Sequence, residues 1–163
     1  MRTKIAAGAA GGLIGGLALA AVIALMPAPA GAGSMLGFMA HLVRSVHPAV
    51  GWLVCAVYGV LIGAWFGRLL HAQVLDAGPA MLWGGVYGLG WWIVAGIVLV
   101  PAALARWPLS IAAVDQVRGV ALPLLIGHLV YGVILGLVWC RITSRPSFQR
   151  HTSQATVAGR RAA

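Results

Sequence analysis

The chain reads VYGVLIGAWFGR at residues 57–68 and VYGVILGLVWCR at residues 130–141. Both stretches are apolar, and both place a tyrosine, two glycines and a closing arginine at the same internal positions. At a constant offset of 73 residues, Tyr58 matches Tyr131, Gly59 matches Gly132, Gly63 matches Gly136 and Arg68 matches Arg141. Two matching apolar stretches of this kind predict an internally duplicated membrane protein.

The composition favours a membrane as the solvent. Of 163 residues, 61% are hydrophobic and 8% are charged, and the mean hydropathy is +0.97. A soluble domain is usually about 25% charged, so this chain has too little charge to cover a water-facing surface. The net charge is +9, and the basic residues lie at the ends of the apolar runs, where they can contact lipid head groups. They are not clustered on one polar face, as a nucleic-acid site would require. We therefore expect membrane lipids, and no nucleic acid, as partners.

Four apolar runs reach the roughly 20 residues that span a bilayer. They lie at about Ile5–Met26, Val50–Leu70, Ala80–Ala103 and Val120–Ile142. Residues 1–142 are therefore expected to form one all-α domain of four transmembrane helices, with repeat one at about 5–70 and repeat two at about 80–142. Residues 143–163 are basic and poor in bulky apolar side chains, which predicts a disordered cytoplasmic tail.

The first run has two interpretations. A basic start followed by an apolar run and small residues at Ala28–Ala32 is typical of a cleavable signal peptide. However, the run exceeds the 7–15 residues or so of a signal core. It also matches the third run at an offset of 74, pairing Gly11, Gly16, Leu25 and Pro27 with Gly85, Gly90, Leu99 and Pro101. Because half of a repeat should be retained, we expect the first run to be a permanent helix.

Two spans in each repeat give both copies the same orientation in the membrane. This is a parallel repeat with a pseudo-twofold axis along the membrane normal. Eight of the eleven Lys and Arg residues lie on the side of the termini and middle loop, which places both termini in the cytoplasm. The outer segments Ser34–Val46 and Leu109–Val120 are predicted to form short interfacial helices.

Glycines spaced four apart predict close helix contacts in both halves, because small residues at this spacing line one helix face. These glycines are Gly8, Gly12, Gly16, Gly59, Gly63, Gly67, Gly84, Gly88, Gly132 and Gly136. If the glycine faces of the second and fourth helices meet near the pseudo-axis, Cys55 and His128 should lie close together at similar depth.

His128, Tyr131, Tyr58 and Cys55 form the candidate intramembrane polar site. An ionisable residue inside a membrane is a functional candidate, and His128 matches Cys55 across the repeat. In the alternative interpretation His128 has only a structural role, and its neutral ring forms an interhelical hydrogen bond with Tyr58. The deep aromatic residues likewise suggest either a pocket for a quinone, pigment or lipid, or packing against glycine grooves.

Metal or haem binding is a further alternative. His41 and His47 lie in the first outer segment and, with His128, are candidate ligands for copper, zinc or haem iron. Solvated loop histidines are the competing interpretation, and no cofactor is our default expectation. Neither cysteine, Cys55 or Cys140, belongs to a CxxC or Cys/His zinc pattern.

Catalytic patterns are missing from the sequence. The two acids, Asp76 and Asp115, lie outside the predicted spans and on opposite membrane sides, so paired-carboxylate chemistry is not expected. The chain contains no GxSxG, phosphate-loop or HExxH motif. We therefore expect a protein that is not an enzyme.

The stretch IGHLVYGVILGLVW at residues 126–139 resembles a GHxxYGxxxG segment of small, uncharacterised four-helix prokaryotic membrane proteins. The resemblance covers the fourth helix and extends in part to the second, where Cys55 replaces the histidine. It implies the four-helix architecture and no activity.

The leading functional hypothesis is a non-catalytic accessory or scaffold subunit that packs against other membrane proteins of a larger complex. A small oligomeric channel or transporter is the alternative from a different class, and a haem or metal carrier using His128 is the third.

Overall fold

The computed structural model describes residues 2–26, 33–69, 76–99 and 122–144, and these residues form helices or the short connections next to them. The helices are α1 (Arg2–Ala24), α2 (Met35–His41), α3 (Pro48–Leu69), α4 (Ala77–Trp92), the π-helix η1 (Ile93–Leu99) and α7 (Leu122–Thr143). Within this part of the chain, α1, α3 and α7 are long and apolar enough to cross a membrane. The predicted outer segment Leu109–Val120 and the tail after Ser144 lie outside the described residues.

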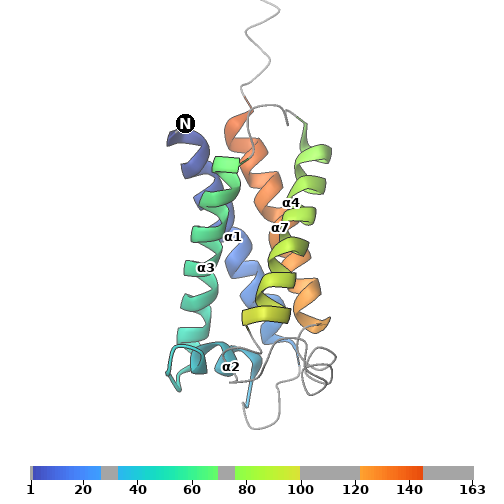
Figure 1. Ribbon diagram of the computed structural model, residues 1–163. Helices are drawn as coiled ribbons and strands as arrows, with labels where there is room; N and C mark the ends of the chain where they lie inside the picture. The colour runs from blue at the N-terminus through green and yellow to red at the C-terminus, as the bar shows by residue number, and fades with distance from the viewer. Residues whose placement is uncertain (1, 27–32, 70–75, 100–121, 145–163) are drawn as a thin grey trace, which may run out of the picture.

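Four helical stretches lie side by side in Figure 1: α1, α3, α4 with η1, and α7. Helix α4 continues directly into η1, so this stretch runs without a break over residues 77–99. Helices α1 and α4 run in one direction, and α3 and α7 run in the other (Figure 1). The start of α1 and the end of α7 therefore lie at the same end of the bundle.

Helices α1 and α3 contact each other through glycine backbones. A Cβ atom built on Gly8, Gly12 or Gly16 would overlap a backbone carbonyl oxygen of α3, those of Gly63, Gly59 and Cys55 respectively. The reverse also holds, because a Cβ on Gly59 would overlap the carbonyl oxygen of Gly12. Only hydrogen at these positions allows the two helix axes to come so close.

Helices α4 and α7 make the same kind of contact. A Cβ built on Gly84 would overlap the carbonyl oxygen of Gly132, and one on Gly88 would overlap that of His128. A Cβ on Gly136 would in turn meet the carbonyl oxygen of Ala80. The glycine faces of α3 and α7 are thus covered by α1 and α4, and they do not meet each other as expected.

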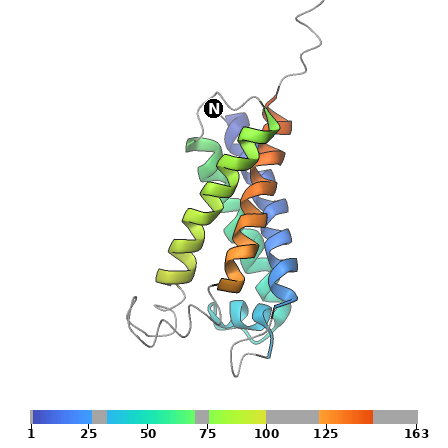
Figure 2. The same ribbon diagram turned by 90° about the vertical axis from the view of Figure 1, so that its right-hand side faces the viewer.

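The two pairs of helices join unevenly. Helix α1 packs closely on α7, where Gly15 receives the ring of Tyr131 and Gly127 receives the Leu19 side chain. Helix α4 with η1 leans away from the other helices toward its η1 end (Figure 2). Aromatic side chains bridge the wider space between α3 and α4, as described below.

The short helix α2 lies across one end of the bundle (Figure 1). It begins at Ser34, whose side-chain oxygen accepts a hydrogen bond from the Gly37 amide at 2.9 Å. After its last residue, His41, the chain turns and places Arg44 at a left-handed φ of 59°. The Arg44 and Ser45 amides donate back to the carbonyls of His41 and Ala40, as in a Schellman motif. This ending explains why the helix is shorter than the predicted Ser34–Val46 segment.

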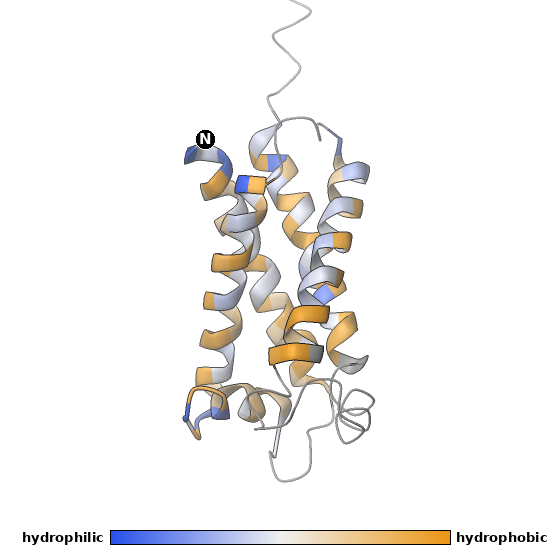
Figure 3. Cartoon of the chain, in the orientation of Figure 1, coloured by the Kyte–Doolittle hydropathy of each residue, from blue (hydrophilic) through white to orange (hydrophobic). Residues whose placement is uncertain are grey.

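The outer surface of the bundle is apolar along its length and basic at one end. Exposed large side chains on the long helices include Leu53, Leu61, Trp65, Leu82 and Trp83. Hydrophilic positions gather where α1 begins and where α3 and α7 end (Figure 3), the location of Arg2, Lys4, Arg68 and Arg141. This distribution suits a protein whose sides face lipid and whose ends face water.

Candidate functional site

Tyr58 of α3 and His128 of α7 face each other between the two pairs of helices. The Tyr58 hydroxyl lies 3.4 Å from His128 Nε2, and His128 Nδ1 lies 2.9 Å from the carbonyl oxygen of Leu124. Because a carbonyl can only accept, Nδ1 carries the proton, and Nε2 of the neutral ring accepts from Tyr58. The His128 side chain, only 3% exposed, is thereby held in one orientation by partners on two helices.

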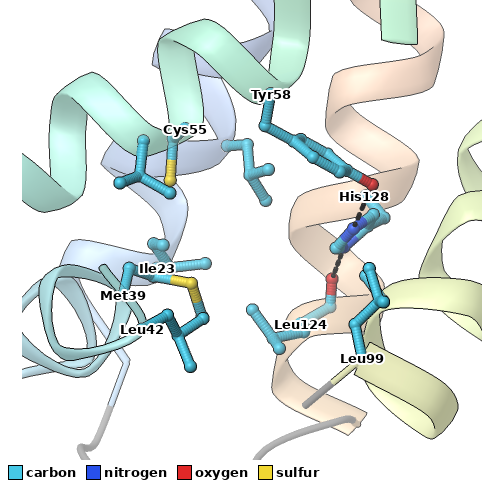
Figure 4. Close-up of a pocket in the computed structure, with 11 residues that line it drawn as sticks. Ile23, Met39, Leu42, Cys55, Tyr58, Leu99, Leu124 and His128 are labelled. Carbon is cyan, nitrogen blue, oxygen red and sulfur yellow. Dashed lines mark hydrogen bonds between the residues drawn. The ribbon is translucent and has the colours of Figure 1, made fainter. Parts of the chain in front are cut away.

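This pair forms part of the wall of a partly open cavity of about 130 Å³. Figure 4 shows the Cys55 side chain of α3 on one side of the cavity and His128 on the other. Apart from Tyr58, His128 and the Cys55 thiol, the lining side chains are aliphatic or thioether groups. The lining comes from α1, α2, α3, η1 and α7 and consists of Leu19, Ile23, Met39, Leu42, Val54, Cys55, Tyr58, Ala95, Leu99, Leu124 and His128.

A cluster of aromatic rings fills the space between α3, α4 and α7. We call it the aromatic cluster; it comprises Tyr58, Phe66, Tyr87, Trp91, Tyr131 and Trp139. Edge contacts run through it, with ring centroids 5.1 Å apart for Phe66 and Tyr87 and 6.2 Å apart for Tyr58 and Trp91. Such edge-to-face pairs are the favoured aromatic geometry, so the cluster fixes the distance between the helices.

The tyrosines of the aromatic cluster also connect α3 to both helices of the other pair. The Tyr87 hydroxyl donates to the Ile62 carbonyl oxygen at 2.8 Å, and the Tyr131 hydroxyl donates to that of Gly59 at 3.1 Å. Together with Tyr58, all three tyrosines of the chain use their hydroxyl groups between helices. Hydrogen bonds of this kind stabilise helix association in an apolar surrounding.

The structure brings three of the four predicted polar-site residues to the cavity. Tyr58 and His128 are hydrogen-bonding partners, and Cys55 lines the opposite side of the same cavity (Figure 4). The ring of Tyr131 lies 6.3 Å from that of Tyr58, but its hydroxyl points to Gly59 and it does not line the cavity. Chemically, the site offers one neutral imidazole, one phenol and one thiol in an apolar enclosure.

The candidate metal ligands are not gathered into one site. His41 and His47 are exposed at the α2 end of the bundle, whereas His128 is buried. Over the described ranges, no group of three His, Cys, Asp or Glu side chains could hold a metal ion. Cys140 lies near the other end of α7, 3.4 Å from the Ser144 hydroxyl, and is not disulfide-bonded to Cys55.

Sequence reasoning missed the cavity residues contributed by α2 and η1. Met39 and Leu42 come from α2 and the turn after it, and Ala95 and Leu99 come from η1. A π-helix is rare and is often found at functional sites, but no residue pattern in residues 93–99 distinguishes it from an α-helix. These four residues had no signal of their own in the sequence.

No protein-family model, no curated protein and no solved structure matches this chain. Its function is therefore inferred from the contacts and chemistry of its own residues.

Proposed function

We propose that the chain is a four-span protein of a bacterial or archaeal cytoplasmic membrane that acts as a non-catalytic accessory or scaffold subunit. The observation that carries this proposal is how the interior tyrosine and histidine side chains are used. The hydroxyls of Tyr58, Tyr87 and Tyr131 and Nε2 of His128 form hydrogen bonds between helices, while Nδ1 of His128 is held by the Leu124 carbonyl of its own helix. These groups serve to hold helices together, which suits a protein that works by packing.

The fourth span of this proposal is α4 with η1. At about 1.5 Å per helical residue, the 16 residues of α4 and the 7 of η1 are long enough to cross the roughly 30 Å thickness of a bilayer core. Their outward side chains, such as Leu82, Val86 and Val98, are large and apolar. The stretch packs along α7, so it has the length, surface and neighbours of a membrane helix.

The glycine contacts support the proposed parallel repeat. Gly12 meets Gly59 in one pair of helices, and Gly84 meets Gly132 in the other. Gly59 of α3 and Gly132 of α7 are 73 residues apart, which is the offset that the sequence predicts for these helices. Gly12 of α1 and Gly84 of α4 are 72 residues apart, whereas the predicted offset is 74. The basic residues Arg2, Arg68 and Arg141 then lie at one end, which we assign to the cytoplasm.

A partner helix has a place to dock on the outer face of α4 and α7. Gly85 contributes little to packing inside the bundle, since a Cβ there would come no closer than 3.7 Å to a Val133 methyl group. Its missing side chain opens a groove of about 370 Å³. The groove is lined by Met81, Leu82, Gly85, Val86, Leu89, Leu129 and Val133. Apolar side chains of another membrane helix would fill this groove by van der Waals packing.

The test is co-purification in mild detergent from the native membrane. We expect the protein to be recovered in a stoichiometric complex with other membrane subunits, and a Gly85→Phe variant to lose them because its side chain fills the groove. Gly90→Phe is the matched control, since Gly90 lies on the same helix and nothing lies within 4 Å of a Cβ built there. Recovery of the wild-type chain only as a monomer or homo-oligomer would contradict the proposal.

The alternatives receive less support from the geometry. Tyr131, Leu135 and Phe66 are fully buried and fill the middle of the bundle, which disfavours a transport path through a single copy. For haem or metal ligation, His128 would first have to give up its contact with Tyr58.

A further inference from the structure

We propose that the cavity beside His128 is a binding site for a small aromatic ring that bears a hydroxyl group, such as a phenol or the head group of a quinol. This site lies inside the bundle and is separate from the groove on α4 and α7. The inference therefore goes beyond the accessory role and does not depend on it.

The first argument is size. A protein interior is packed to the density of an organic crystal, with few voids larger than a water molecule. A cavity of about 130 Å³ is close to the ~150 Å³ of an engineered apolar cavity that stays dry and binds benzene. One six-membered ring is therefore the largest rigid group that fits without moving the helices.

The second argument is the character of the walls. The lining from Leu19, Ile23, Val54 and Leu99 is aliphatic, so water has few partners there and an apolar occupant is favoured. The two thioether and thiol groups, from Met39 and Cys55, are polarisable and make favourable contacts with ring edges. An aromatic body suits these walls better than a charged or strongly hydrated one.

The third argument is the single polar position, the Tyr58–His128 pair. Nδ1 of His128 is held by the Leu124 carbonyl, so Nε2 is an acceptor, and Tyr58 donates to it over a long 3.4 Å separation. The two polar atoms are closed against each other and present no polar surface to the cavity, so a ligand hydroxyl reaches them when the Tyr58 side chain turns aside; it can then donate to Nε2 and accept from Tyr58 at the same time. A ketone could only accept, and would leave Nε2 without a donor. The pair therefore selects a hydroxyl group over a carbonyl group.

The fourth argument is access from the membrane. Val54 and Tyr58 line the cavity and also line a groove of about 450 Å³ on the outer surface of α3. The groove continues over Val57 and Leu61, which are 50% and 60% exposed. A ring with a long alkyl chain could leave its chain in this groove, whereas a free phenol would need no such exit.

The experiment uses ¹⁹F NMR of the full chain in lipid nanodiscs with two probes, 4-fluorophenol and fluorobenzene. We expect saturable binding of 4-fluorophenol to the wild type and its loss in Ala95→Phe, whose ring would occupy the cavity. Val94→Phe is the matched control, because Val94 is the preceding residue of η1 and is absent from the lining. Equal melting temperatures of the two variants would show that both remain folded.

Tyr58→Phe tests recognition of the hydroxyl group. It should weaken 4-fluorophenol binding about fivefold, the value of one ordinary hydrogen bond, and leave fluorobenzene binding unchanged. The proposal is overturned if the wild type shows no saturable binding. It is equally overturned if 4-fluorophenol and fluorobenzene bind with the same affinity and Tyr58→Phe changes the affinity of neither probe.

A competition experiment distinguishes a ligand dissolved in the membrane from a free phenol in solution. Displacement of 4-fluorophenol by 4-decylphenol dissolved in the nanodisc lipid supports a membrane-borne ligand whose chain lies along the groove on α3. Binding of 4-fluorophenol that 4-decylphenol does not displace supports a free phenol. Protection of the Cys55 thiol from a small alkylating reagent by 4-fluorophenol, measured in a Cys140→Ser background, should occur in either case.

Discussion

At the scale of single residues, the side chain that glycine lacks decides how closely the helices approach. Gly12→Ala should destabilise the fold by about 1–3 kcal/mol, because its Cβ would overlap the rigid carbonyl oxygen of Gly59 and force α1 and α3 apart. Gly90→Ala is the control, since it has open space around it and alanine favours a helix. Thermal unfolding in detergent should show a lower midpoint for the first variant and no loss for the second.

The interhelical tyrosines give a second prediction at this scale. Tyr131→Phe and Tyr87→Phe should each cost about 0.5–1.5 kcal/mol, because each removes one hydrogen bond to a backbone carbonyl of α3 and keeps the ring. Both residues belong to the aromatic cluster and bond to carbonyls one turn apart, those of Gly59 and Ile62, so the double variant should cost more than either single variant but not the exact sum. Reversible unfolding in mixed detergent micelles measures them, and a double variant as stable as the wild type would refute the assignment.

The sequence predicted part of the polar site and missed the rest for a physical reason. Matching depths of Cys55 and His128 along two helices can be read from spacing, and both residues line the cavity. The rotation of each helix about its axis is harder to infer when apolar residues surround it on all sides. For this reason the sequence did not show that the Tyr131 hydroxyl points at Gly59 while Tyr58 points at His128.

At the scale of helices, the proposed repeat explains why α3 and α4 stand apart. With the offset of 72, Gly15 and Leu19 of α1 correspond to Tyr87 and Trp91 of α4. The small residue lets α1 receive the Tyr131 ring and lie close to α7, whereas the two large rings keep α4 at a distance from α3. The cavity lies beside this less compact junction, where the two halves differ most.

The sequence alignment of the first and third runs was in a different register because it relied on few positions. Gly11 and Gly16 match Gly85 and Gly90 at an offset of 74, but in a glycine-rich chain such matches arise by chance. If the proposed repeat holds, the backbone contacts pair Gly12 with Gly84 and so favour an offset of 72. Contact with a partner helix identifies equivalent glycines where spacing alone leaves alternatives.

Helix α1 is expected to remain part of the mature protein. Helix α1 covers the glycine face of α3 and, through Gly11 and Gly15, also packs on α7. Its removal would expose backbone groups of both helices to lipid, so we expect the protein purified from membranes to retain this helix. Intact mass spectrometry is the measurement. A mature mass corresponding to cleavage near residues 28–32 would show that the run is a signal peptide after all.

At the scale of the whole molecule, the ends of the bundle differ in charge while its sides are uniformly apolar. Arg2, Lys4, Arg68 and Arg141 lie at one end, and Arg44 lies in the turn after α2 at the other. Composition alone was sufficient to predict a membrane protein. The positions of α1, α3 and α7 could also be predicted to within a few residues, because long apolar runs leave few alternatives in a bilayer.

The charge difference predicts the orientation. Basic residues near helix ends are retained on the cytoplasmic side, so a green fluorescent protein fused after residue 163 should fluoresce and alkaline phosphatase fused there should be inactive. Alkaline phosphatase inserted beside Ser45, in the turn after α2, should be active. Because the start of α1 and the end of α7 lie at the same end of the bundle, the opposite reporter pattern would reverse the whole molecule and place the cavity of Cys55 and His128 toward the cytoplasm. An active phosphatase at both positions would instead mean an odd number of spans, and would remove α4 with η1 from the membrane.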